Sequence, residues 1–348
     1  MPDKRLDIAV VGCGAVTEHK HLPFLSRRAD CRVTVLVDHD ESRAKGLAAR
    51  FGVSRTSTEY RAVLGLGVDA AVVALPNHLH APVSIELLEA GIHVLVEKPM
   101  APTVAECDAM VKAAGAGHAV LAVGLMRRFL YSGRFVKWAV ESGLLGRITS
   151  FDIRDGGVFN WPLASNSFFR KETACGGVLM DTGAHTLDQM LWWLGEVGSF
   201  EYVDDNYGGV EAECELQVRL KSGAEGIVVL SRRRNLRNTA IIRGEEGELE
   251  VGLGRNHLSL SFRGSPVRVT GQGVPWEPSA IAQQTQGDLM DAEHDDLFES
   301  IRTGQSPTAS GAEGRRSVAL IEACYRERGE LQLPWMSTRP APLAKVGG

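Results

Sequence analysis

The sequence has few cysteines, few lysines and no long apolar run. Its six cysteines are scattered without a C-x-x-C pair, which argues against a disulfide framework and against a zinc knuckle. No apolar run approaches the roughly 20 residues of a membrane span, and the first residues contain no apolar signal core. The formal net charge of -5 gives no general attraction to nucleic acid or anionic membranes. We therefore expect a cytoplasmic protein with reduced thiols and with neither a nucleic-acid nor a membrane partner.

A glycine turn follows the first apolar run. The segment Leu6–Val11 is typical of a buried strand, and it ends at Gly12-Cys13-Gly14-Ala15-Val16-Thr17, after which a helical pattern extends toward Ser26. Strand, glycine turn and helix form the context in which such glycines let the backbone approach a pyrophosphate. Thr17 stands where a third glycine or alanine is usual, which weakens the motif.

The second predicted strand, 33–37, ends in Asp38, at the distance where an acidic side chain binds the adenosine ribose hydroxyls of a dinucleotide. His39 and Asp40 follow, and neither offers a cation to a 2′-phosphate. This favours NAD over NADP, with Arg43 as the residue that would reverse the preference. The alternative is that Asp38 caps the helix predicted over 42–50.

Apolar strands and helices then alternate as far as residue 123, which predicts a parallel, doubly wound sheet that binds ligands at the carboxyl ends of its strands. Two loops at those ends carry polar groups, Pro76-Asn77-His78-Leu79-His80 and Glu97-Lys98-Pro99. His78 and His80 can also be explained as polar residues of a turn without a functional role. The Lys98 ammonium, by contrast, is placed to polarise a substrate oxygen. A metal site that joins His78 and His80 to His19 and His21 lacks a nearby carboxylate, and we expect no metal.

The segment 176–188 begins with two glycines and places Asp181, His185 and Asp188 at helical spacing on one face. A carboxylate and an imidazole one turn apart can hold a proton-transfer pair in fixed geometry. The alternative is an amphipathic helix with Asp181 near its positive N-terminus and a solvated His185.

The second half is typical of an α+β domain. A long loop over 156–175 is the candidate substrate wall, with a hydrophobic cap between domains as its alternative. From residue 211 alternating segments predict an antiparallel meander, and two helices near 281–301 and 312–328 precede a Pro-rich tail that we expect to be mobile. The basic cluster Arg232-Arg233-Arg234 with Arg237 either contacts a phosphate, as in a nucleotide-linked sugar, or is a solvated strand end. Substrate-binding candidates here are Arg154, Trp161, Phe169 and Arg170.

These pieces, in this order, resemble the Gfo/Idh/MocA oxidoreductases, which include glucose-fructose oxidoreductase and inositol 2-dehydrogenase. The matching segments are 12–17, 75–80, 97–99, Arg127-Arg128-Phe129 and 176–188. The resemblance implies a Rossmann domain over 1–124, an α+β domain with a large open, mostly antiparallel sheet over 125–332, and a tail over 333–348. It implies a homodimer or homotetramer formed through that sheet. It further implies a catalytic set of Lys98, Asp181 and His185, and a cofactor site of Gly12, Gly14, Ala15, Val16, Asp38, Pro76, Asn77, His80, Glu97, Lys98 and Arg127.

By this resemblance we expect an NAD-dependent oxidoreductase that oxidises a secondary hydroxyl, or reduces a ketone, of a sugar, aminosugar or cyclitol. His185 would be the general base, Lys98 would stabilise the developing alkoxide, and Asp181 would orient His185 or bind a neighbouring hydroxyl. The alternatives are an NAD-dependent glycoside hydrolase, a nucleotide-sugar ketoreductase and an NAD-sensing regulatory protein. Arginine outnumbers lysine 29 to 9, which we interpret as the codon usage of a GC-rich genome, and natural-product sugar biosynthesis is a hypothesis on that ground alone.

Overall fold

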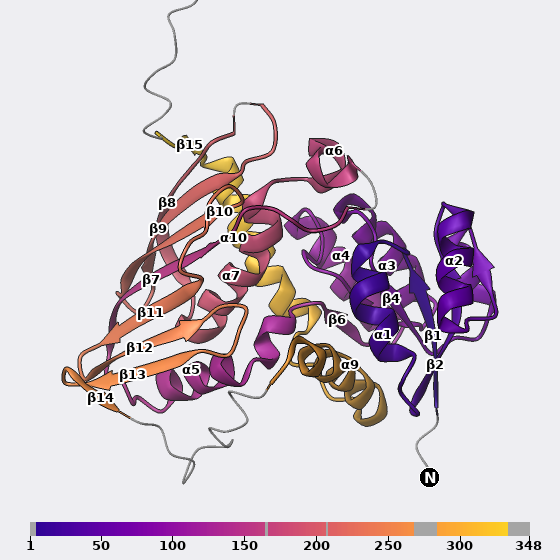
Figure 1. Cartoon of the computed structure of the whole chain (residues 1–348), viewed down its shortest axis with the longest axis horizontal. Helices are drawn as coiled ribbons and strands as arrows, with labels where there is room; N and C mark the ends of the chain where they lie inside the picture. The colour runs from indigo at the N-terminus through magenta and orange to yellow at the C-terminus, as the bar shows by residue number, and fades with distance from the viewer. Residues whose placement is uncertain (1–4, 164–165, 207, 268–283, 333–348) are drawn as a thin grey trace, which may run out of the picture.

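The structure is a computed structural model that describes residues 5–163, 166–206, 208–267 and 284–332 (Figure 1). The predicted C-terminal tail, the first three residues of the helix predicted over 281–301 and two residues of the long loop lie outside the described residues. None of the described helices has the length and apolar character that crossing a membrane requires.

The first sheet has six parallel strands in the order β3-β2-β1-β4-β5-β6. β1 pairs in parallel with β2 on one side and with β4 on the other, so the strand order reverses between them. In such sheets a ligand crevice forms at this reversal, outside the carboxyl ends of the strands. The strands are β1 Leu6–Val11, β2 Cys31–Val37, β3 Thr56–Ser57, β4 Ala70–Val73, β5 His93–Val96 and β6 Leu121–Val123.

Helices cover both faces of this sheet, which explains why its central strands are continuously apolar. On one face, α3 (His80–Glu89) and α4 (Val104–Ala116) pack through residues such as Leu87 and Met110. On the other, Leu297 and Phe298 of α9 (Gln286–Thr303) share a core with the strands and with α1 (Leu22–Leu25). The remaining elements here are η1 Thr17–His21, α2 Glu41–Phe51, η2 Tyr60–Gly65 and η3 Asn77–Leu79.

The second sheet has nine strands in the order β14-β13-β12-β11-β7-β10-β9-β8-β15. The predicted antiparallel meander is wrong at its centre, because β7 lies between β10 and β11 and runs parallel to β10. Gly226 on β10 makes this possible, since a Cβ there would lie 2.4 Å from the Phe151 ring of β7. The strands are β7 Ile148–Gly156, β8 Val197–Asp204, β9 Glu213–Leu220, β10 Glu225–Ser231, β11 Thr239–Gly244, β12 Gly247–Gly252, β13 Leu258–Phe262, β14 Ser265–Val267 and β15 Gly329–Glu330.

Three helices cover the inner face of the second sheet: α5 (Tyr131–Glu141), α7 (Val178–Leu194) and α10 (Gly311–Arg326). Figure 1 shows the sheet at one edge of the molecule, with these helices between it and the first domain. α7 therefore presents one side to the sheet and the other toward the Rossmann strands. Shorter elements are η4 Met126–Phe129, η5 Asn166–Phe169 and α6 Lys171–Ala174.

Candidate functional site

A cavity of about 710 Å³ lies between the two domains, at the carboxyl ends of the first-sheet strands. Its walls come from the glycine turn, the loops after β2, β4, β5 and β6, the loop after β7, and helices α7 and α9. Every residue predicted to bind the cofactor or to act in catalysis lines this cavity: Gly12, Gly14, Ala15, Val16, Asp38, Pro76, Asn77, His80, Glu97, Lys98, Arg127, Asp181 and His185. The chain thus brings these residues together, and their roles stay predictions.

The glycine turn has the geometry of a nucleotide cradle. Gly12 has a φ of +101°, and a Cβ there would lie 2.1 Å from the Ala74 carbonyl oxygen, so only glycine fits. Thr17, which departs from the usual motif, is fully buried and donates its hydroxyl to the Gly12 carbonyl at 2.6 Å. The threonine therefore stabilises the turn from inside.

Asp38 is held by two backbone donors beside this turn. Its Oδ2 accepts from the Cys13 N–H at 2.8 Å, and its Oδ1 accepts from the Asp40 N–H at 2.9 Å. Arg43 also lines the cavity, and its Nη1 lies 3.5 Å from Asp38 Oδ1. Helix α2 is capped by Asp40 rather than by Asp38, so the capping alternative does not explain Asp38. A narrow glycine turn next to a fixed carboxylate fits the adenosine half of a dinucleotide.

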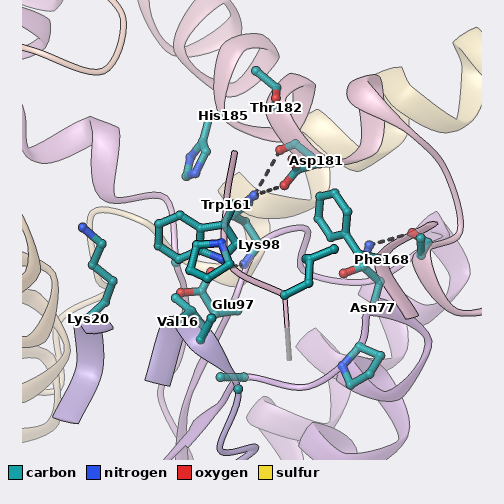
Figure 2. Close-up of a pocket in the computed structure, with 18 of the residues that line it drawn as sticks. Val16, Lys20, Asn77, Glu97, Lys98, Trp161, Phe168, Asp181, Thr182 and His185 are labelled. Atoms are coloured by element: carbon teal, nitrogen blue, oxygen red, sulfur yellow. Dashed lines mark hydrogen bonds and ion pairs between the residues drawn. The ribbon is translucent and has the colours of Figure 1, made fainter. Parts of the chain in front are cut away.

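Lys98 and Asp181 form the central ion pair of the cavity (Figure 2). Lys98 Nζ lies 2.5 Å from Asp181 Oδ1 and donates to the Asp181 carbonyl at 3.2 Å. Arg232 Nη2 lies 3.1 Å from the other carboxylate oxygen. Burial alone would raise the pKa of Asp181, but Lys98 and Arg232 hold it below its ordinary value. Asp181 is therefore an anion that contacts a cation at each oxygen.

The two glycines before α7 allow the helix to start where it does. A Cβ on Gly176 would lie 2.2 Å from the Tyr325 hydroxyl, and one on Gly177 would lie 1.9 Å from the Glu211 carbonyl. The buried Glu211 Oε1 accepts from the N–H groups of Gly177 at 2.9 Å and Leu179 at 3.0 Å. The Glu211 side chain thus satisfies two of the free N–H groups at the start of the helix, and its backbone carbonyl accepts from the Val178 N–H at 2.9 Å.

His185 lies one turn further along α7, with its ring turned toward Lys98 (Figure 2). Burial, together with the positive charges of Lys98 and Arg127, lowers the pKa of His185 well below 6.5. Its Nδ1 is buried without a hydrogen-bond partner among the described residues. The imidazole is therefore neutral, and the Asp181 carboxylate is engaged by Lys98 and Arg232.

The third residue of the predicted face, Asp188, belongs to the core rather than to the cavity. Both of its oxygens accept from the buried Arg128, at 2.6 and 2.9 Å, and Arg128 also pairs with Glu313 at 2.8 Å. This network ties α7 and η4 to α10. The neighbouring Arg127 instead faces the cavity and pairs with Asp155 at 2.5 Å.

The loop after β4 is tied to both domains. Asn77 Nδ2 donates to the Ala174 carbonyl at 2.7 Å. The buried His80 places its two ring nitrogens 2.7 Å from the Pro99 carbonyl and 2.8 Å from the Leu75 carbonyl. These contacts fix the segment that carries Lys98. Among the described residues, no group of three His, Cys, Asp or Glu side chains is arranged to hold a metal ion.

The long loop contributes to the cavity wall, although not through all the predicted residues. Trp161 lines the cavity, together with Phe159 and Phe168. Three substrate-binding candidates are not among the described residues that line it: Arg154 pairs with Asp152 at 2.9 Å, and Phe169 and Arg170 are exposed.

Several lining residues escaped prediction because no local pattern marks them. Asp155 at the end of β7 shares an oxygen between Arg127 and the Thr186 hydroxyl, which donates at 2.7 Å. Glu293 comes from α9, a helix that otherwise covers the first sheet. Burial and the neighbouring Glu97 raise the pKa of Glu293 well above 4.5. Others in this group are Lys20, Thr182, Asn238, Leu289 and Met290.

Comparison with known proteins agrees with this architecture. The chain matches the Gfo/Idh/MocA model described as "Oxidoreductase family, NAD-binding Rossmann fold" over residues 6–125, and the model of its C-terminal alpha/beta domain over residues 137–336. It is 28% identical over 334 residues to levoglucosan dehydrogenase of Pseudarthrobacter phenanthrenivorans, covering 83% of this chain and 85% of that protein.

It is also 26% identical to inositol 2-dehydrogenase 2 of Saccharopolyspora erythraea, with 92% of each chain covered. A solved structure of levoglucosan dehydrogenase in complex with NADH and L-sorbose superposes with a TM-score of 0.82 at 25% identity, covering 93% of this chain and 96% of that one. The chain therefore belongs to the Gfo/Idh/MocA family of NAD-dependent oxidoreductases.

Proposed function

We propose that this protein oxidises a secondary hydroxyl of a sugar, aminosugar or cyclitol, or reduces the corresponding ketone. The observation that carries the proposal is the placement of Lys98, Asp181 and a neutral His185 in the same cavity as the glycine turn. Relatives named levoglucosan dehydrogenase and inositol 2-dehydrogenase 2 support a polyhydroxylated ring as the substrate class.

Each catalytic side chain has a distinct task in this proposal. In the oxidation direction the neutral His185 removes the proton of the reacting hydroxyl, which its lowered pKa allows at neutral pH. The Lys98 ammonium stabilises the negative charge that develops on the same oxygen. Asp181 orients Lys98 and accepts a hydrogen bond from a neighbouring substrate hydroxyl. Orienting His185 is not its task, because no hydrogen bond of the described structure joins the two side chains and His185 Nδ1 has no partner there.

NAD, when bound, accepts the hydride from the substrate carbon. Gly12, Gly14, Ala15 and Val16 would hold its pyrophosphate, and Asp38 its adenosine ribose. Pro76, Asn77, His80, Glu97 and Arg127 would line the path toward the reacting end. Trp161 and Phe168 form an aromatic wall that excludes water and packs against the apolar faces of a sugar ring.

The test is absorbance at 340 nm with NAD and NADP in parallel, across sugars, aminosugars and cyclitols, free and nucleotide-linked. We expect a sustained rise with NAD for one ring pattern. Release of an aglycone from glycosides without net NADH would favour the NAD-dependent glycoside hydrolase. NAD binding without turnover of any compound would favour the NAD-sensing regulatory protein.

The outer face of the second sheet is the proposed contact between subunits. Its inner face is covered by α5, α7 and α10, whereas the opposite face carries charged pairs such as Arg154 with Asp152. We expect a homodimer or homotetramer formed through this face, and light scattering after gel filtration measures its molar mass. A monomer at micromolar concentration would contradict it. A role in natural-product sugar biosynthesis stays a hypothesis.

A further inference from the structure

Arg232 is the member of the basic cluster that reaches the cavity. It follows the last residue of β10, lines the cavity, and has only 9% of its surface exposed. The other members do not line the cavity within the described structure. Arg233 is exposed and lies 4.0 Å from Asp205, Arg234 pairs with Glu213 at 3.1 Å, and Arg237 pairs with Asp152 at 2.9 Å. The sequence cluster therefore contains one buried cation beside the catalytic groups.

The guanidinium of Arg232 is rigidly held but incompletely hydrogen-bonded. Its side-chain hydrogen bonds to the described residues come from Nη2, which reaches Asp181 Oδ2 at 3.1 Å and the Gly177 carbonyl at 3.1 Å. Nε is buried and has no acceptor among those residues. The guanidinium carbon lies 4.4 Å from the centroid of the Phe168 ring and 5.8 Å from that of Phe159. Aromatic faces fix such a cation without using its N–H donors.

The charges around Arg232 do not balance. Asp181 is one carboxylate shared by two cations, Lys98 at Oδ1 and Arg232 at Oδ2. Arg127 forms an ion pair with Asp155, so these two side chains together add no net charge. At Asp181 itself, two cations of the described structure therefore contact one carboxylate. A buried cation with unused donors is stabilised when an anion completes its hydrogen bonds.

We propose that Arg232 binds a carboxylate of the substrate, so that the substrate class is sugar acids and related polyhydroxy carboxylates. This inference rests on the proposed function for its reacting hydroxyl. Arg232 and Lys98 contact opposite oxygens of the same Asp181 carboxylate. The anion and the hydroxyl that reacts therefore belong to one small molecule. A planar carboxylate matches the planar donor fork of arginine.

The test measures equilibrium binding to the protein saturated with NADH, by calorimetry, with matched acid and neutral sugars. The pairs are D-glucuronate with D-glucose and D-galacturonate with D-galactose, and D-gluconate is added as an open-chain acid. At least one acid should bind about tenfold or more tighter than its neutral partner, since a charge-assisted pair contributes roughly 1.5–3 kcal/mol. Equal affinities, or no saturable binding of any acid, would overturn the proposal.

Arg232→Met removes the charge while keeping the length of the side chain, and it should abolish the preference for the acid. Arg237→Met is the matched control, because it removes a charge from the same cluster at a residue that does not line the cavity within the described structure. Circular dichroism establishes that both variants fold. A preference that persists in Arg232→Met would overturn the assignment, as would tighter Arg232-dependent binding of a sugar phosphate than of any acid.

Turnover of the same panel separates this inference from the proposed function. Oxidation of neutral sugars with no preference for acids would contradict the anion site and leave the dehydrogenase standing. Arg232-dependent binding of acids, with no turnover of any compound, would support the anion site and contradict the dehydrogenase.

Discussion

The Nε2 atom of the buried His21 lies 3.0 Å from Oε1 of Glu97, a residue that lines the cavity. The group that each ring nitrogen contacts indicates whether that nitrogen carries a proton. The Met290 carbonyl can only accept, so the His294 Nδ1 at 2.8 Å carries a proton. Burial and the neighbouring His21 lower the pKa of His294 to about 3, which leaves its Nε2 as an acceptor for His21 Nδ1 at 3.3 Å.

The remaining His21 nitrogen, Nε2, makes its hydrogen bond with Glu97. Burial favours the neutral acid, but His21 and Lys98 hold the pKa of Glu97 below 4.5. Glu97 is accordingly a carboxylate that contacts the buried His21 ring. The other oxygen of Glu97 accepts from the Lys98 N–H at 3.1 Å, so this pair supports the backbone that carries the catalytic lysine.

His21→Asn should destabilise the fold, because it removes the imidazole that contacts the buried Glu97 carboxylate. We expect a loss of about 3 kcal/mol or more in the free energy of unfolding, measured by urea titration, together with weaker NAD binding. His118→Asn is the control: His118 is exposed with a φ of +52°, a conformation that asparagine adopts readily. Equal unfolding midpoints for the two variants would contradict a stabilising contact between His21 and Glu97.

Lys98→Met should lower kcat by about 10²-fold or more while the protein stays folded, since the ammonium stabilises charge at the reacting oxygen. Lys112→Met on the exposed side of α4 removes a lysine of the same length far from the cavity and should change kcat by less than about twofold. Steady-state rates at saturating NAD provide the comparison. Near-normal turnover in Lys98→Met would remove this residue from the catalytic set.

The pH profile reports on His185. Oxidation requires its neutral form, so activity is lost only as the pH falls through its pKa, which burial and the charges of Lys98 and Arg127 place well below 6.5. We therefore expect kcat/KM for oxidation to stay level from pH 8 down past 6.5. Samples returned to neutral pH separate titration from acid unfolding. An acid limb at or above pH 6.5 that disappears in His185→Gln would contradict the lowered pKa.

Local patterns predicted the parts of the site that depend on one element, and missed those that depend on packing between elements. The spacing of Asp181 and His185 placed both on the cavity side of α7, but the same spacing included Asp188, which Arg128 binds in the core. Nothing local distinguishes a helix residue that faces a cavity from one that faces an arginine of another segment.

The same limit applies to the second sheet and to the cavity wall. Alternating residues predicted the strands near 213–231, yet the insertion of β7 beside β10 depends on the fit of Phe151 over Gly226. In the sequence, Glu293 looks like any acidic residue on a helix. The packing of α9 on the first sheet brings it to the cavity.

Asp38 should exclude the 2′-phosphate of NADP by charge, since two like charges about 4 Å apart cost on the order of 4 kcal/mol near a protein surface. Asp38→Asn keeps the shape and removes the charge, and the ratio of kcat/KM for NADP to that for NAD should rise roughly tenfold to a hundredfold. Asp40→Asn is the matched control, because Asp40 caps α2 and does not line the cavity among the described residues. An unchanged ratio in Asp38→Asn would assign the selectivity to other groups.

Gly177→Ala tests whether the start of α7 positions the catalytic residues. The new Cβ would lie 1.9 Å from the Glu211 carbonyl, so the strand that follows Glu211 or the first turn of α7 must move. We expect the free energy of unfolding to fall by about 2 kcal/mol or more, and kcat to fall while the Kd for NAD, whose cradle lies on the other domain, stays within about twofold. Gly115→Ala is the control: it lies inside α4 with nothing within 4 Å of the added atom, and it should stabilise the protein by up to about 1 kcal/mol. An unchanged kcat in Gly177→Ala would mean that Asp181 and His185 keep their positions without the close approach of Glu211.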